Sequence, residues 1–160
     1  RGDRLWGRIA LSGAARAMRI LAVDWGGRRV GLAATDESGR FARPVGRILR
    51  SSDRQAVGEV AGRAKELGVA LIVMGLPLHM GGQEGEEAAR ARRIAAKLGK
   101  ASGIEVVLRD ERLTSHEAYQ RLRAQGVHGE RAEERIDEVA AAVLLEDYLA
   151  ERSGSPGPKG

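Results

Sequence analysis

The sequence contains no cysteine, few aromatic residues and no long apolar run. Without cysteine there are no disulfide bonds, which fits a reducing compartment, so we expect a cytoplasmic location. A membrane-spanning helix needs roughly 18 consecutive apolar residues, and no window approaches that length, so we expect no membrane association. Aromatic residues make up only 3% of the chain, which leaves no recognisable set of rings for stacking on bases.

Groups typical of nucleophilic catalysis and of zinc sites are also scarce. None of the three histidines, His79, His116 and His128, lies in the sequence context of a serine hydrolase. The histidines also lack the spacing of zinc ligands and have no cysteine companions. Acidic side chains therefore remain as the candidates for chemistry.

The formal net charge of +5 is weak evidence for a nucleic-acid partner. Residues 1–17 carry four arginines and one aspartate, which leaves a net charge of only +2 for the remainder. The distribution is more informative, because residues 28–54 hold seven arginines against three acids. Arginine suits bidentate contacts with phosphate, although a compositional bias toward arginine would give the same excess.

A length of 160 residues predicts a single domain with a hydrophobic core. Residues 1–17 lack the continuous apolar block of a secretory signal, and we interpret them as an N-terminal extension with Met18 as the expected natural start. Residues 18–152 would form the domain. Residues 153–160 are rich in Ser, Pro and Gly, and we expect a disordered tail.

The stretch of residues 18–36 organises the chain. Residues 20–23 form an apolar run of the kind found in a strand covered on both faces, and the run ends at Asp24. Ligands of open α/β sheets bind beyond the carboxyl ends of the strands, so Asp24 is a candidate ligand-binding residue. Gly26 and Gly27 then allow a tight reversal into a second strand. The same pattern also fits a hairpin in which Asp24 only shapes the turn.

The remaining pattern predicts a mixed α/β fold. Three sequential strands form an antiparallel meander, and the helical crossovers that follow add parallel strands, giving a five-stranded mixed sheet flanked by helices. Pro44 confines the third strand to an edge or a bulge. Thr114 and Glu117 match a capping box. The further strands are expected at residues 41–50, 69–74 and 104–108, the helices at residues 56–67, 84–98, 114–125 and 135–152, and a mobile loop at residues 127–134.

Acidic residues stand at the ends of three of these elements: Asp24, then Asp110 or Glu111, then Asp137. The residues at helical spacing after Asp137 are apolar, so its side chain should lie on an inward face, although Glu138 has nearly the same surroundings. Carboxylates gathered without histidine or cysteine suit Mg²⁺ or Mn²⁺. Such ions support hydrolysis of phosphodiesters.

Four blocks of the sequence resemble the YqgF/RuvX family, the Holliday-junction resolvases and pre-16S ribosomal RNA nucleases of bacteria. The resemblance covers residues 18–149, and its blocks are ILAVDWGGRRVGLAATD, IVMGLPLHMGGQEG, VVLRDERLTS and ERIDEVAAAVLLEDYL. It implies a ribonuclease H-like fold, a divalent metal and catalytic residues at Asp24, Glu111 and Asp137, with Asp110 as a substitute or support for Glu111. Two departures are Arg29, where the family often has lysine, and an acidic-mixed segment at residues 129–135.

We therefore expect a metal-dependent endonuclease that cleaves either four-way DNA junctions or pre-16S ribosomal RNA. A homodimer would suit a two-fold symmetric junction. The alternatives are a nucleic-acid-binding module without catalysis and a single nucleotide-binding lobe of the actin and sugar-kinase type. The candidate substrate-binding residues are Arg28, Arg29, Gly75, Pro77, Gly82 and Arg112, of which Arg112 is expected mainly to orient a neighbouring carboxylate.

Overall fold

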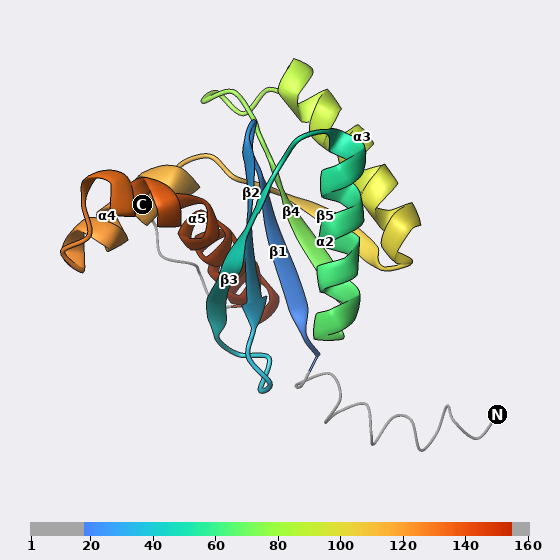
Figure 1. Ribbon diagram of the computed structural model, residues 1–160, viewed down its shortest axis with the longest axis horizontal. Coiled ribbons are helices and arrows are strands. Elements are labelled where there is room, and N and C mark those ends of the chain that lie inside the picture. Colours follow the sequence, from blue (N-terminus) through green and yellow to red (C-terminus); the bar gives the residue numbers. More distant parts are fainter. Residues whose placement is uncertain (1–17, 155–160) are drawn as a thin grey trace.

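The structure is a computed structural model that describes residues 18–154. The expected N-terminal extension, residues 1–17, and most of the expected disordered tail, residues 155–160, lie outside the described residues. Residues 18–154 form five strands and four helices in the predicted order (Figure 1). The strands are β1 (Ile20–Trp25), β2 (Arg29–Thr35), β3 (Ala42–Leu49), β4 (Leu71–Leu76) and β5 (Glu105–Asp110). The helices are α2 (Asp53–Leu67), α3 (Glu86–Ser102), α4 (Thr114–Ala124) and α5 (Gly129–Arg152).

The five strands form one mixed sheet in the order β3-β2-β1-β4-β5. The pairs β1–β2 and β2–β3 are antiparallel, whereas β4 pairs in parallel with both β1 and β5. The predicted meander with parallel additions is thus confirmed. The strand that contains Pro44 lies at the edge of the sheet, next to a register shift between Leu32 and Ala33, as the missing N–H of proline requires.

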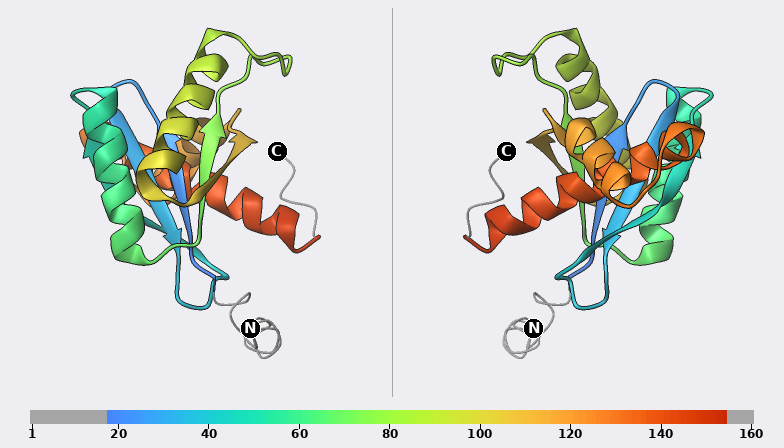
Figure 2. Two further views of the ribbon diagram at one scale, coloured as in Figure 1. Left: turned by 90° about the vertical axis from the view of Figure 1, so that its right-hand side faces the viewer. Right: turned by 90° about the vertical axis from the view of Figure 1, so that its left-hand side faces the viewer.

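Helices cover both faces of the sheet (Figure 2). Successive side chains of β1 point to opposite faces, so Leu21 and Val23 pack with α2 and α3 while Ile20 and Ala22 pack with α5. Helix α4 packs on α5 through a smaller apolar cluster. The apolar run of the first strand is continuous because both of its faces are buried.

Three helix starts show where local patterns were sufficient and where they were not. Helix α2 begins at Asp53, three residues before the predicted start, with the capping interactions of Ser52 and Gln55. The capping box predicted for α4 is wrong, because the Thr114 hydroxyl donates to the Glu111 carbonyl (2.9 Å) and Glu117 accepts from Arg121 instead. Helix α3 begins at Glu86 rather than Glu84.

The loop predicted at residues 127–134 is also wrong in its greater part, because α5 begins at Gly129. Ala132 and Ile136 are buried against Leu122 of α4, so the polar residues between them occupy the outer face of an amphipathic helix. Most residues in the range 129–136 are polar, so the two apolar positions among them, Ala132 and Ile136, did not indicate a helix start at residue 129 in the sequence. None of the helices within residues 18–154 has the length and apolar character needed to cross a bilayer.

Candidate active site

The three predicted acids line one cavity of about 360 Å³. Asp24 lies near the carboxyl end of β1, and Glu111 directly follows β5, which runs in the same direction. Asp137 comes from α5, which packs against β1 and β2. The residues that line the cavity are Asp24, Trp25, Gly26, Gly27, Gly75, Pro77, Glu87, Arg90, Ala91, Ile94, Glu111, Ser115 and Asp137.

Gly31 brings the acid of α5 to the sheet. A Cβ atom at Gly31 of β2 would lie 2.0 Å from the backbone oxygen of Asp137, so the two backbones are in direct contact. Only glycine permits this approach, since it has no side chain to separate the strand from the helix. Gly31 therefore determines how deeply Asp137 sits.

Gly75 allows an equally close approach of the Glu111 side chain. The strand was predicted to end at residue 74, but Gly75 lies within β4, where it is buried beneath the Glu111 side chain. A Cβ atom at Gly75 would lie 1.9 Å from Oε1 of Glu111. The missing side chain thus leaves the space that the Glu111 carboxyl group occupies.

We expect Gly75→Ala to displace the Glu111 carboxyl group and to lower the rate of nucleic-acid cleavage by about 100-fold, as misplacement by about 1 Å does in enzymes. Stability should change little, because the clash involves the end of a flexible side chain. Steady-state cleavage and thermal unfolding would be measured together, with Gly62→Ala on the exposed side of α2 as the control. An unaltered cleavage rate in Gly75→Ala would contradict this role.

The side chains of Asp24 and Glu111 are hydrogen-bonded to each other. Burial and the nearby charge of Asp137 raise the pKa of Asp24 from 3.8 to about 6, although the bond with Glu111 acts in the opposite direction. Burial, the charge of Asp24 and the same bond raise the pKa of Glu111 from 4.5 to about 8. Burial is the largest cause of both increases, so the cavity disfavours the ionised form of each carboxyl group.

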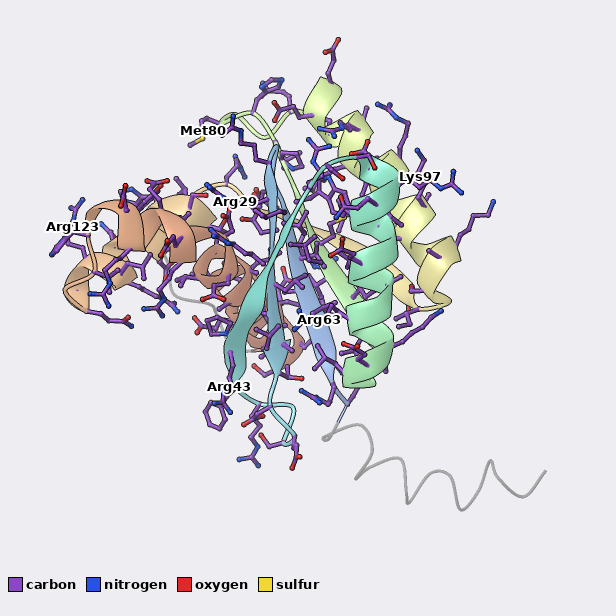
Figure 3. All side chains as sticks on the ribbon, viewed as in Figure 1. Arg29, Arg43, Arg63, Met80, Lys97 and Arg123 are labelled. Carbon is purple, nitrogen blue, oxygen red and sulfur yellow. The ribbon has the colours of Figure 1, made fainter. Side chains whose placement is uncertain are left out.

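Asp137 has a different partner. Its Oδ2 atom accepts from Nε of Arg29 at 2.7 Å, and both side chains are partly buried. Figure 3 labels Arg29 in the region where α5 approaches the sheet. Within residues 18–154, no three acidic or histidine side chains are grouped as metal ligands. The structure therefore brings all three acids to one cavity but places only Asp24 and Glu111 in contact.

The structure distinguishes the acids that the sequence left as alternatives. Asp110 is exposed and lies outside the cavity lining, and Arg112 bonds its carboxylate with Nε at 2.9 Å and Nη2 at 2.7 Å. These bonds lower the pKa of Asp110. Arg112 also donates to the carbonyl of Met80 at 2.8 Å, which ties the loop after β4 to the end of β5. Glu138 lies outside the cavity lining, whereas Asp137 is part of it.

The predicted substrate-binding residues are dispersed around the cavity. Pro77 lines it, and the exposed Arg28 side chain has no hydrogen bond or ion pair among the described residues. Gly82 lies in the loop after β4, outside the cavity lining, with a positive φ of 95°. Sequence reasoning missed Trp25, Glu87, Arg90 and Ser115 as lining residues. No local pattern separates Glu87 and Arg90 from the other charges of α3.

The donor set of the cavity fits a hard divalent cation. Its ligands would be carboxylate oxygens, the type that Mg²⁺ and Mn²⁺ prefer. Burial and neighbouring carboxylates raise the pKa of both Asp24 and Glu111, and a cation held by these two groups would favour their ionised forms.

Comparison with known proteins is consistent with this geometry. A family model described as RuvX, Holliday junction resolvase, matches residues 18–151. A relative named "Putative pre-16S rRNA nuclease" from Anaeromyxobacter sp. (strain K) is 43% identical over 136 residues, which cover 85% of this chain and 99% of the relative. A protein of the same name from Chloroflexus aurantiacus is 39% identical over 137 residues, covering 86% of this chain and 90% of that protein.

Solved structures share the fold at low sequence identity. RuvC of Thermus thermophilus superposes with a TM-score of 0.52 at 15% identity, covering 89% of this chain and 100% of RuvC. Fowlpox virus resolvase, solved with substrate Holliday junction DNA, gives a TM-score of 0.53 at 12% identity and covers 84% of this chain and 99% of the resolvase. The fold is ribonuclease H-like, as the sequence predicted.

Proposed function

The chain belongs to the RuvX family of Holliday junction resolvases, and on this premise we propose that it is a nuclease that hydrolyses phosphodiester bonds at the cavity containing Asp24 and Glu111. The observation that carries the proposal is the hydrogen-bonded carboxyl pair at the carboxyl ends of β1 and β5. Two carboxyl groups whose ionisation burial disfavours are costly to the fold, so their place in a cavity is better explained by binding than by stability.

We propose that Asp24 and Glu111 hold a divalent cation, Mg²⁺ or Mn²⁺, with Asp137 as the third acid. When bound, such a cation supplies an activated water and neutralises charge on the phosphorus. Glu111 must release its proton to solvent before it can act as a ligand, because only the ionised carboxylate binds a cation. Arg29 orients Asp137 through its ion pair and reduces the negative charge that the cavity presents to a phosphate.

Two substrates agree with the comparisons, a four-way DNA junction and a precursor of 16S ribosomal RNA. We expect the protein to cleave at least one of them in the presence of Mn²⁺ and neither in the presence of a chelator. A synthetic junction and a 5′-extended precursor RNA would be incubated side by side at matched salt, since affinity for nucleic acid depends steeply on salt. If the junction is the substrate, we propose that a homodimer makes paired cuts, which sedimentation of the complex would reveal.

A second candidate function is a nucleic-acid-binding module without catalysis. The ion pair between Arg29 and Asp137 favours this alternative, because one of the three acids is already neutralised. Binding of either nucleic acid without cleavage at any Mn²⁺ concentration would support the binding module and refute the nuclease. The nucleotide-binding lobe of the sugar-kinase type is disfavoured, because the resolvase family model spans residues 18–151.

A further inference from the structure

Helix α3 forms one wall of the cavity and contributes its only basic side chain. Among the described residues that line the cavity, four are acidic and Arg90 alone is basic. The Arg90 side chain is 41% exposed, so part of its guanidinium group faces solvent. A phosphate that approaches the acids therefore meets one fixed cation at the cavity.

Asp53, the first residue of α2, holds Arg90 in place. Its Oδ1 atom accepts from Nη2 of Arg90 and from Nη1 of Arg50, both at 2.8 Å. Arg50 in turn donates to the carbonyl of Gly27, which lines the same cavity. The network therefore joins the β1–β2 turn, the start of α2 and the wall formed by α3.

One carboxylate neutralises only one of these two guanidinium groups. The network of Arg50, Asp53 and Arg90 keeps a net charge of +1, which is the charge that one phosphodiester requires. Arg50 is the more buried of the two arginines, with 17% of its side chain exposed. Nε and Nη1 of Arg90 have no hydrogen-bond partner among residues 18–154, so they are available to a ligand.

We propose that Arg90 binds a backbone phosphate of the nucleic acid and thereby positions the strand at the acids, an inference that rests on the proposed nuclease function. Asp53 acts as a positioning residue, because it fixes the direction of the Arg90 guanidinium group. A prepositioned arginine loses less side-chain freedom on binding than a mobile surface arginine does. The contact recognises phosphate alone, so it would serve DNA and RNA equally.

Arg90→Gln tests this contact, because it removes the charge and keeps most of the side chain. Binding to the four-way junction and to the precursor RNA would be measured by fluorescence anisotropy at several salt concentrations, with chelator present to prevent cleavage. The slope of log Kd against log salt should decrease by about 0.7 to 0.9, the change expected for one lost phosphate contact. Affinity at about 0.1 M salt should fall by about tenfold. Arg90→Lys should retain the salt slope of the wild type.

Arg93→Gln is the matched control. Arg93 lies on the same helix, is exposed, makes no ion pair within the described part of the chain and does not line the cavity. If both variants lose the same amount of slope, the effect comes from net charge alone and the proposal is overturned. A wild-type slope in Arg90→Gln would also overturn it. Thermal unfolding of Arg90→Gln should superimpose on that of the wild type.

The salt series also separates this inference from the proposed activity. If the wild-type protein cleaves neither substrate but shows a slope that depends on Arg90, the nuclease function fails and the phosphate contact stands. If the wild type cleaves and the slope does not depend on Arg90, the contact fails and the nuclease stands.

Discussion

Asp24→Asn is expected to abolish cleavage and, at the same time, to stabilise the protein in the absence of metal. The cleavage rate should fall by at least about 1000-fold, because a charged ligand of the proposed cation is lost. The free energy of unfolding at pH 8 should rise by about 1–3 kcal/mol, since a pKa raised by burial is a cost to the folded state of about 1.4 kcal/mol per unit. The variant would thus combine loss of activity with a gain in stability.

The sign of this effect follows from proton binding. The pKa of Asp24 is raised to about 6 and that of Glu111 to about 8 in the folded protein, so the folded state binds protons more tightly than the unfolded chain does. The contribution of these groups to the free energy of unfolding therefore decreases as the pH rises from about 4 to about 8. Asp24→Asn should flatten this dependence.

Urea unfolding at pH 5 and pH 8, with chelator in the buffer, measures both the gain and its pH dependence. Asp110→Asn is the control, because the bonds from Arg112 lower the pKa of Asp110 and its loss should not stabilise the fold. A variant Asp24→Asn that is less stable than the wild type at pH 8, or that cleaves at the wild-type rate, would be incompatible with the assignment of the acid pair.

Gly31→Ala is expected to lower the free energy of unfolding by about 3 kcal/mol or more, the upper end of the cost of overpacking a core. The added methyl group would lie 2.0 Å from the Asp137 oxygen and 2.2 Å from its carbonyl carbon. Both are backbone atoms, so no side-chain rotation relieves the clash and α5 must move away from β2. Cleavage should be lost as well, because Asp137 moves with the helix.

Chemical unfolding of Gly31→Ala should be compared with that of Gly58→Ala. Gly58 lies on the exposed side of α2, and a Cβ atom there would meet nothing within 4 Å. Alanine at this helical position should stabilise the protein by about 0.5–1 kcal/mol, because it reduces the entropy of the unfolded chain. Equal stabilities of Gly31→Ala and the wild type would show that α5 does not rest on β2 as described.

One expectation failed because of a contact between two helices, and the other because of a bond to the loop that precedes a helix. Residues 129–134 were predicted as a loop, because their polar composition conceals the packing of Ala132 against α4. The capping box at Thr114 was predicted from spacing alone, but the Thr114 hydroxyl bonds the carbonyl of Glu111. In both cases a partner outside the local pattern decided the conformation.

Local patterns did not distinguish Asp137 from Glu138, whereas the order of the elements, the edge position of Pro44 and the candidate acid Asp24 were readable from the sequence. Each depends on side-chain period, backbone chemistry or charge within a short segment, which are local properties. Only the tertiary structure decided that Glu111 rather than Asp110 lines the cavity, that Arg29 pairs with Asp137 and that Arg90 joins Asp53. Arg29 and Asp137 are 108 positions apart in the sequence, and Arg90 and Asp53 are 37 positions apart. They meet only because the helices pack on the sheet and on one another.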